Sequence, residues 1–423
     1  MKIQGPTNKL IGDLQVMGDK SISHRAIIHA SLSSQESLLK NVLRAGVTKS
    51  MIDCLRILGV NIIENNCDLI VKGGNWIKPN KPLDCGNSAT TMRLLMGALA
   101  AQNFSAELTG TPSLQHRPMK RIAEPLRQMG ATISQNKAPL VITGGKLRGI
   151  VHHSEVASAQ VKASLLLAAM QAKGTTTICQ PGPSRDHSER MLSEIGINLQ
   201  YDDKKVTLVP NENQINPTNI TIPGDISSAS FLLAAAITIP NSHITLRKIG
   251  INTTRTGILD AMKKMGADID VFNHAKSGGE PIADISARYS TLKGIMLEGN
   301  IVTRMIDEFP IFTILSTQAK NTTIVRDAAE LRLKESDRIS SLIEELNKMG
   351  TKFEEYHDGY KLTGPQKLKG AKLSSHGDHR IAMSLAIAGM LAKGNTVISE
   401  SDIADESYPN FQKTFNVLGA QIV

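Results

Sequence analysis

The feature that most constrains the fold of this 423-residue chain is a helix ending that occurs six times. A Leu, Met or Ile is followed by glycine and then by a short β-rich stretch, at Gly59, Gly130, Gly196, Gly266, Gly350 and Gly419. The steps between these glycines are 71, 66, 70, 84 and 69 residues. Glycine readily takes the left-handed conformation that ends a helix. Six nearly even steps therefore predict six related structural units.

A second repeated element precedes each of these helices, and it consists of a small polar segment that opens a strongly apolar helix. The segments lie at 18–25, 86–90, 157–160, 224–228, 307–310 and 377–380. Because helices such as those through 165–169 and 231–236 are apolar on all sides, we expect them to be buried. A unit of roughly 70 residues cannot bury such a helix alone, so we expect three units to share each of two cores.

The polar starts of the buried helices predict binding of anions. Helix N-termini carry free N–H groups and partial positive charge, which favour phosphates and carboxylates. The net charge of +9 is spread as one or two basic residues per helix start. This distribution favours small anionic substrates, although a basic nucleic-acid-binding module remains an alternative of another class. The aromatic content of 3% argues against a surface that stacks single-stranded nucleic acid.

Several other classes of protein are not indicated. No CxxC pair is present, which is typical of a reduced, cytoplasmic protein. Residues 1–10 have no apolar core, so we expect no signal peptide, and no apolar run reaches the ~18 residues of a membrane helix. His152–His153 and the pair His376 and His379 lack further ligands, so no metal is expected. No dinucleotide-binding, Walker or nucleophile-elbow motif occurs, and we expect no cofactor.

Candidate site residues lie at the helix starts. Lys20, Ser21 and Arg25 open one helix and supply a point charge, a hydroxyl and a planar fork for an oxyanion. The turn 86–90 is similar to a phosphate-binding turn but is not a P-loop. We expect 116–118 to open an amphipathic helix, with Pro118 in its first turn. Arg117 and Arg185 would then lie near helix N-termini, where a cation is unfavourable unless an anion binds beside it.

The charged stretch 331–338 predicts a solvated helix with salt bridges, in which Lys334, Glu335 and Arg338 share a face. Asp307 and Glu335 are the carboxylates that we would pair for proton transfer. Neighbouring cations normally lower the pKa of a carboxyl group, so burial or bound anions would have to offset that effect.

Taken together, these motifs resemble the 5-enolpyruvylshikimate-3-phosphate (EPSP) synthase family, the 3-phosphoshikimate 1-carboxyvinyltransferases. The matching stretches cover nearly the whole chain in the family's order: 18–25, 86–93, 116–118, 158–160, 182–187, 307–310, 331–338 and 377–383. The resemblance implies an α/β fold, a two-domain inside-out α/β barrel with three βαβαββ repeats per domain (the enolpyruvyl transferase fold). One domain would combine 1–18 with 224–423, the other would span 19–223, and the active site would lie in the inter-domain cleft.

The resemblance also implies the reaction. The enolpyruvyl (1-carboxyvinyl) group of phosphoenolpyruvate moves to the 5-hydroxyl of shikimate 3-phosphate by addition and then loss of phosphate, which is the sixth step of the shikimate pathway to chorismate. It implies no metal and no cofactor, no nucleic acid or membrane partner, and a cytoplasmic monomer. The nearest alternative is the sister transferase that acts on UDP-N-acetylglucosamine, but neither Cys54 nor Cys85 matches that family's loop cysteine.

Residue roles follow from the same resemblance. The implied catalytic residues are Lys20, Asp307 and Glu335. The residues that match shikimate 3-phosphate contacts are Lys20, Ser21, Arg25, Ser158, Gln160, Ser184, Arg185, Asp307 and Lys334. The residues that match phosphoenolpyruvate contacts are Lys20, Asn87, Ala89, Arg117, Gln160, Arg338, His379 and Arg380.

Two positions depart from the better-studied, glyphosate-sensitive members. Ala89 stands where those members carry glycine, so we expect weak binding of the inhibitor glyphosate, as in the tolerant branch. Glu406 precedes the Ser407–Tyr408–Pro409 run where the sensitive branch has a substrate-contacting lysine. That contact is expected to be lost or supplied by another residue.

Overall fold

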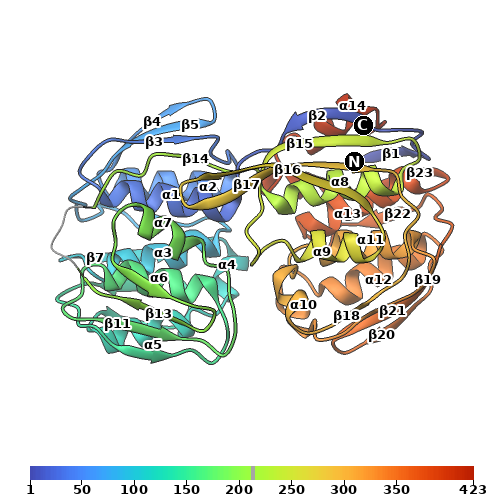
Figure 1. Ribbon diagram of the computed structural model, residues 1–423. Coiled ribbons are helices and arrows are strands. Elements are labelled where there is room, and N and C mark those ends of the chain that lie inside the picture. Colours follow the sequence, from blue (N-terminus) through green and yellow to red (C-terminus); the bar gives the residue numbers. More distant parts are fainter. Residues whose placement is uncertain (211–214) are drawn as a thin grey trace. The chain divides into compact units, whose positions relative to one another are not determined.

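The computed structural model describes residues 1–210 and 215–423, which form two compact units (Figure 1). Unit 1 comprises Met1–Met17, Gly224–Ala275 and Pro281–Val423, and unit 2 comprises Gly18–Pro223 and Lys276–Glu280. Each unit encloses a hydrophobic core of its own. The segment Lys276–Glu280 departs from the expected boundaries, because the hydroxyl of Ser277 donates to the carbonyl of Thr221 in unit 2 at 2.6 Å.

Unit 2 contains three four-stranded sheets, with strand orders β10-β11-β13-β12, β14-β3-β5-β4 and β6-β7-β9-β8. Its helices are α1 (Lys20–Leu32), α2 (Gly46–Ile57), α3 (Ala89–Leu99), α4 (Pro112–His116), α5 (Lys120–Met129), α6 (Ala159–Ala169) and α7 (His187–Glu194). Its strands are β3 (Ser37–Lys40), β4 (Asn61–Asn65), β5 (Asp68–Lys72), β6 (Leu83–Asp84), β7 (Ser105–Thr109), β8 (Thr132–Ile133), β9 (Leu140–Thr143), β10 (Val151–His153), β11 (Thr176–Cys179), β12 (Leu199–Tyr201), β13 (Lys205–Leu208) and β14 (Ile220–Thr221).

Unit 1 also contains three sheets, with strand orders β1-β23-β22, β16-β17-β15-β2 and β18-β19-β21-β20. Its helices are α8 (Ile226–Thr238), α9 (Gly257–Lys264), α10 (Asn300–Arg304), α11 (Phe309–Gln318), η1 (Ala329–Leu333), α12 (Arg338–Lys348), α13 (His379–Leu391), η2 (Ser401–Glu406) and α14 (Phe411–Leu418). Its strands are β1 (Lys2–Gly5), β2 (Ile11–Gln15), β15 (His243–Gly250), β16 (Asp268–Ser277), β17 (Glu280–Arg288), β18 (Met296–Leu297), β19 (Asn321–Val325), β20 (Phe353–Tyr356), β21 (Gly359–Gly364), β22 (Lys372–Ser374) and β23 (Gly394–Ser399).

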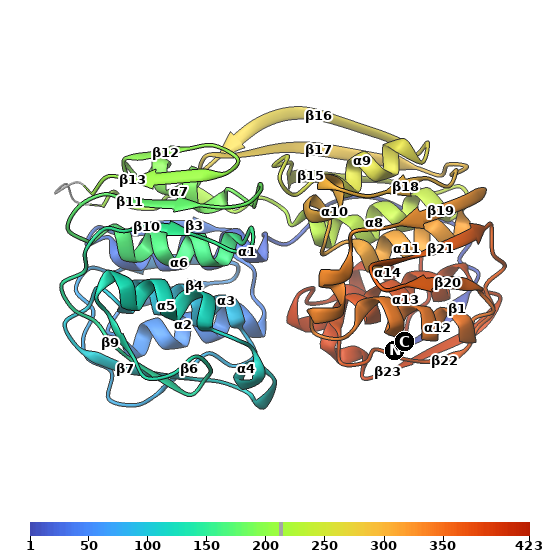
Figure 2. The ribbon, with the colours of Figure 1, turned by 90° about the horizontal axis from the view of Figure 1, so that it is seen from below.

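The repeat predicted from the sequence is visible in the strand pairing. Strands β6 and β7 are parallel and joined through α3, and the antiparallel pair β8 and β9 follows α5. Strands β18 and β19 repeat this pattern through α11, with β20 and β21 after α12. Parallel strands need a crossover and antiparallel strands do not, so these two repeats read βαβαββ. Within each unit, Figures 1 and 2 show the sheets outside and the crossover helices inside.

The six glycines and the apolar helices confirm the predicted repeats. All six glycines have positive φ, between +89° and +118°. Every residue of α8 is buried, and so are all but the last residue of α13. Helix α3 packs against α6, and α11 packs against α13. The three repeats of a unit therefore share one core, because the crossover helices have no polar face to turn toward water.

Two local predictions were wrong. The segment 116–118 does not open a helix: Arg117 is extended, with ψ 133°, and α5 begins at Lys120. Pro118 disfavours a helical conformation of the residue before it, which accounts for the break. The stretch 331–338 is not one helix either, because η1 ends at Leu333 and Asp337 caps the start of α12.

Burial of His29 on α1 leads to a prediction about acid stability. Burial, with a smaller contribution from Arg25, lowers the pKa of His29 to about 3. In the unfolded chain this histidine takes up a proton near pH 6.5, whereas in the folded protein it does so only near pH 3. The contribution of His29 to the free energy of unfolding is therefore complete above pH 6.5 and declines as the pH falls toward 3. At pH 4.5 the loss is about 2–3 kcal/mol. His29→Leu should remove this part of the pH dependence, which urea unfolding at pH 7 and pH 4.5 measures.

The control for this experiment is His153→Leu, which changes an exposed histidine on β10. An unchanged pH dependence in His29→Leu would contradict the assignment to His29.

Candidate active site

In unit 2, Arg25 connects the starts of three helices. Its Nε donates to Ser188 Oγ on α7 at 2.7 Å, and its two terminal nitrogens donate to the carbonyls of Ser21 at 3.0 Å and Ala159 at 3.5 Å. Asp19 caps α1 by accepting from the backbone N–H of Ile22 at 2.9 Å. The guanidinium is therefore fixed among helix N-termini, where oxyanions bind favourably.

The charge of Arg25 persists although the side chain is buried. Burial lowers the pKa of Arg25 to about 10, and the charges of Glu189, Asp19 and Glu280 oppose that effect. The group is thus protonated at neutral pH. A buried cation held in one orientation can receive a phosphate without first losing side-chain freedom.

Ser158, Gln160 and Ser184 take part in two sets of hydrogen bonds. Gln160 on α6 donates to Thr90 Oγ1 at 3.0 Å, and its amide oxygen accepts from Arg93 of α3. The hydroxyl of Ser184 donates to the side chain of Gln180 at 2.7 Å, and Gln180 donates to the carbonyl of Ser158 at 3.2 Å.

The other predicted residues of unit 2 lie at or shortly before helix starts. Lys20 is the first residue of α1, and Ala89, which is 5% exposed, is the first of α3. Asn87 precedes α3 and accepts from Thr111 Oγ1 at 3.2 Å. Arg117 and Arg185 are half-buried in the loops before α5 and α7.

In unit 1, Arg338 is the centre of a cluster of carboxylates. Its Nε donates to Asp378 Oδ2 at 2.8 Å, and its Nη2 donates to Glu335 Oε2 at 2.7 Å. A third carboxylate oxygen, Oδ1 of Asp307, lies 3.6 Å from its Nη1. The side chain of Arg338 is only 2% exposed, so the predicted solvated salt bridge is instead a buried one.

The electrostatics of this cluster favour charged partners. Burial disfavours the charge of Arg338, but Asp378, Glu335 and Asp307 outweigh burial and raise its pKa. Burial likewise raises the pKa of Asp378, but Arg338 and His379 outweigh it, so the net pKa is lowered. Both groups are therefore ionised at neutral pH and hold each other in place.

Asp307 and Arg380 are also brought together. Nη1 of Arg380 donates to the backbone carbonyl of Asp307 at 2.9 Å, and its Nη2 lies 3.9 Å from the carboxylate of the same residue. The neighbouring carboxylate of Glu308 lies 3.8 Å from Nη1 of Arg380. His379 and Arg380 are the first residues of α13 and are both 5% exposed.

Lys334 and Glu335 lie at the exposed rim of this cluster. Both belong to the non-helical segment between η1 and α12. The side chain of Glu335 is 26% exposed, and Nζ of Lys334 donates to Glu330 at 2.7 Å. The structure thus gathers five of the six predicted residues of unit 1 around Arg338 and Asp378, while Lys334 contacts Glu330, and the helical face that was expected to align them does not exist.

Several residues of these networks were not foreseen from the sequence. Arg93, Glu308 and Asp378 each touch a predicted residue, and each stands in or just before the first turns of an apolar helix. The buried pair of Lys162 and Glu189, whose Nζ and Oε1 atoms form an ion pair, is a further case. A charge at the start of an otherwise apolar helix is the signal that could have identified them, because buried charges need partners.

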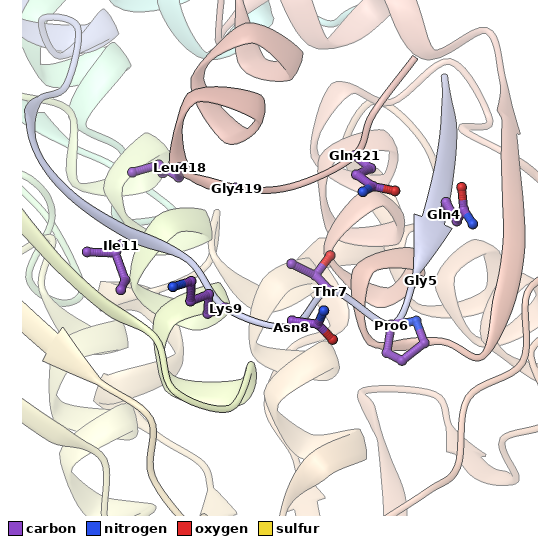
Figure 3. Close-up of a pocket in the computed structure, with 10 residues that line it drawn as sticks. All are labelled: Gln4, Gly5, Pro6, Thr7, Asn8, Lys9, Ile11, Leu418, Gly419 and Gln421. Atoms are coloured by element: carbon purple, nitrogen blue, oxygen red, sulfur yellow. The ribbon is translucent and has the colours of Figure 1, made fainter.

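Other features of the described residues lie outside these groups. One group of side chains has the spacing of a metal site: Glu344, Glu345 and His376. The ammonium group of Lys348 already donates to both of its carboxylates, at 3.0 and 2.8 Å. A pocket of about 380 Å³ in unit 1 contains none of the predicted site residues (Figure 3). No helix among the described residues is long and apolar enough to cross a membrane.

Comparison with known proteins places the chain among named relatives. A family model described as EPSP synthase (3-phosphoshikimate 1-carboxyvinyltransferase) matches residues 4–415. A 3-phosphoshikimate 1-carboxyvinyltransferase of Thermodesulfovibrio yellowstonii is 46% identical over 418 residues, which cover 97% of each chain. The enzyme of that name from Bacillus subtilis is 44% identical over 417 residues, again covering 97% of each chain.

Solved structures agree with these matches. An EPSP synthase from Acinetobacter baumannii superimposes with a TM-score of 0.91 at 39% identity and covers 99% of this chain and 97% of its own. The enolpyruvyl transferase NikO from Streptomyces tendae has a TM-score of 0.82 at 17% identity, covers 99% and 97%, and bears on the fold alone. The predicted enolpyruvyl transferase fold is confirmed.

The buried pair of Arg338 and Asp378 leads to a prediction about stability. Asp378→Ala should destabilise the protein by about 3 kcal/mol, because it leaves a buried cation less compensated and removes the cap of α13. Urea unfolding measures the change. The control is Glu354→Ala, which breaks the exposed pair with Lys361 and should leave the midpoint nearly unchanged. A loss below about 1 kcal/mol in Asp378→Ala would contradict the expectation.

Proposed function

We propose that this chain, which belongs to the EPSP synthase family, transfers the 1-carboxyvinyl group of phosphoenolpyruvate to the 5-hydroxyl of shikimate 3-phosphate and releases phosphate. The proposal rests on the sequence identity with 3-phosphoshikimate 1-carboxyvinyltransferases over nearly the full chain. The two groups of fixed cations around Arg25 and Arg338 also suit two phosphorylated substrates.

The unit 2 group is proposed to bind shikimate 3-phosphate. Arg25 and Arg185 offer planar guanidinium groups to the phosphate, and Lys20 offers a mobile ammonium. Ser21, Ser158, Gln160 and Ser184 supply hydrogen bonds to the phosphate and the ring. Gln180 holds the side chain of Ser184 and the backbone carbonyl of Ser158 before the substrate arrives, so less conformational freedom is lost there on binding.

The residues proposed to bind phosphoenolpyruvate come from both groups. Arg338 and Arg380 present two arginines whose positions are set by Asp378, Asp307 and Glu308. His379 stands beside them, and the proposed set also includes Lys20, Asn87, Ala89, Arg117 and Gln160, whereas Lys334 is proposed to contact shikimate 3-phosphate. Fixed cations of this kind hold the carboxylate and phosphate while charge develops at the reacting carbon.

Asp307 and Glu335 are proposed to move the protons. Asp307 accepts the proton of the 5-hydroxyl as its oxygen attacks the central carbon of phosphoenolpyruvate, and Glu335 protonates the methylene carbon. The resulting tetrahedral intermediate then loses a proton from the new methyl group and expels phosphate. Asp307 and Glu335 each have a carboxylate oxygen within 3.6 Å of a nitrogen of Arg338, so one buried cation lies beside both proposed proton-transfer groups.

The buried cysteines support this reaction over that of the sister family. Cys54 and Cys85 are both fully buried, and Sγ of Cys54 donates to the carbonyl of Asp84 at 3.3 Å. Neither therefore offers a loop thiol as an acid for a uridine-diphosphate sugar. We also propose that the enzyme is a cytoplasmic monomer; all four cysteines are free thiols, as expected in a reducing compartment.

The first test is phosphate release from phosphoenolpyruvate with and without shikimate 3-phosphate. Wild type should release phosphate only with shikimate 3-phosphate, and Glu335→Ala should lower kcat by at least ~100-fold because the proton donor is lost. The matched control is Glu330→Ala, which removes the exposed partner of Lys334. Release that needs UDP-N-acetylglucosamine instead would assign the chain to the sister reaction, and no turnover with either acceptor would refute the proposal.

We further propose that the enzyme tolerates glyphosate, because the methyl group of Ala89 is buried at the start of α3. Ala89→Gly should relieve an overlap of about 1–3 kcal/mol and lower the inhibition constant of glyphosate by ~tenfold or more. The KM for phosphoenolpyruvate should change much less. Inhibition of the wild type at low micromolar glyphosate would contradict the proposed tolerance.

A further inference from the structure

The first turn of α7 contacts three separate segments of unit 2. His187, Ser188 and Glu189 are consecutive and are at most 2% exposed. His187 Nδ1 lies 2.8 Å from Glu280 Oε1, Ser188 accepts from Arg25, and Glu189 pairs with Lys162 of α6. This turn directly follows Ser184 and Arg185. The position of this turn therefore determines where Ser184 and Arg185 lie and how the guanidinium group of Arg25 is oriented.

One of the three contacts comes from a distant part of the chain. Glu280 is 93 residues from His187 in sequence and belongs to the tip Lys276–Glu280 between β16 and β17. The strands that flank the tip belong to unit 1, whereas the tip itself belongs to unit 2. The chain thus enters unit 2 a second time for only five residues, and Glu280 brings a carboxylate that is 0% exposed.

The tip is shaped for close contact with unit 2. Gly278 and Gly279 have φ of +54° and +79°, which glycine adopts without strain. An added Cβ on Gly278 would lie 2.2 Å from Ile220 Cδ1, and one on Gly279 would lie 2.9 Å from the carbonyl oxygen of Arg190 on α7. With the hydrogen bond of Ser277 to Thr221, these contacts fix where Glu280 meets His187.

Charge balance gives the contact a further role. Arg25 and Lys162 are buried cations, and Glu189 and Glu280 are the buried carboxylates beside them. The charge of Glu280 is one of those that oppose the effect of burial on the pKa of Arg25. Unpaired buried cations would repel one another before any substrate arrived.

We propose that Glu280 is a positioning residue for shikimate 3-phosphate: through its hydrogen bond with His187, the hairpin tip holds the first turn of α7, and thereby Arg185 and Arg25, in the binding orientation. This inference rests on the proposed function and adds to it a residue from outside the sequence range expected for that domain. Glu280 touches no substrate, so its effect is on binding of shikimate 3-phosphate rather than on the chemical step.

The test compares Glu280→Ala with Glu280→Gln, which keeps an acceptor oxygen for His187. The dissociation constant of shikimate 3-phosphate alone is measured by calorimetry, and KM for each substrate and kcat are measured by turnover. Glu280→Ala should weaken binding of shikimate 3-phosphate ~tenfold, with the KM for phosphoenolpyruvate within about twofold at saturating shikimate 3-phosphate. Glu280→Gln should bind within ~threefold of wild type, because it keeps the hydrogen bond to His187 and loses only the smaller contribution of the charge.

Asp270→Asn is the matched control, because Asp270 is an exposed carboxylate on β16 that pairs with Arg288. It should bind shikimate 3-phosphate as wild type does. A purely structural role for Glu280 predicts a lower melting temperature in Glu280→Ala with unchanged affinity of the folded protein, and that result would overturn the inference. Weak binding that glutamine does not restore would also overturn it, in favour of a role for the charge alone.

If Glu280→Ala does not fold, Ser277→Ala provides the same test more gently, because it removes only the hydroxyl that anchors the tip. It should raise the dissociation constant of shikimate 3-phosphate ~2–3-fold, and an unchanged constant would overturn the inference. The wild type separates the two proposals. If it turns over shikimate 3-phosphate and all variants bind equally well, only the role of Glu280 fails; if it neither binds nor converts this substrate, the proposed function fails as well.

Discussion

The burial on all sides of apolar crossover helices such as α8 and α11 is the constraint on which the rest of the structure depends. A crossover helix such as α8 has no polar face, so it must be enclosed by the sheets and helices of all three repeats in its unit. Hydroxyl groups near the C-terminal ends, such as those of Thr238 and Ser316, donate to carbonyls of their own helix. Charged side chains such as Arg25 and Arg380 instead stand in the first two turns. Packing three helices together therefore also gathers their polar starts, as the contacts of Arg25 with α6 and α7 show.

Each group of helix starts contains several buried charges, and these charges are stabilised by ion pairs with one another. Arg338 contacts three carboxylates, and Arg25 lies among Glu189, Glu280 and Asp19. Removing a charge from water is costly unless a partner is close. The same ion pairs fix the guanidinium groups before any substrate binds. The contacts that allow these charges to be buried therefore also orient them for anionic substrates.

Predictions from the sequence succeeded for some local features and failed for others. Glycine caps and apolar periodicity identified the repeats, because a left-handed cap and an all-apolar helix are properties of a few adjacent residues. The same reasoning failed at Arg117 and at 331–338, where Pro118 and the cap of Asp337 interrupt a pattern that looked helical. Glu335 still reaches Arg338, since three residues of non-helical chain span the distance as well as one helical turn does.

By itself, the sequence determined the six repeats, the buried helices and the polar residues at their starts, because each of these depends on residues that are neighbours in the chain. The tertiary structure alone decided which charges meet. Nothing near Glu280 in the sequence indicates a partner 93 residues away, and Asp378 meets Arg338 only because α12 and α13 pack in the same unit. A buried charge is stable only beside its counter-charge, and that pairing is set by how the repeats pack, which no local pattern encodes.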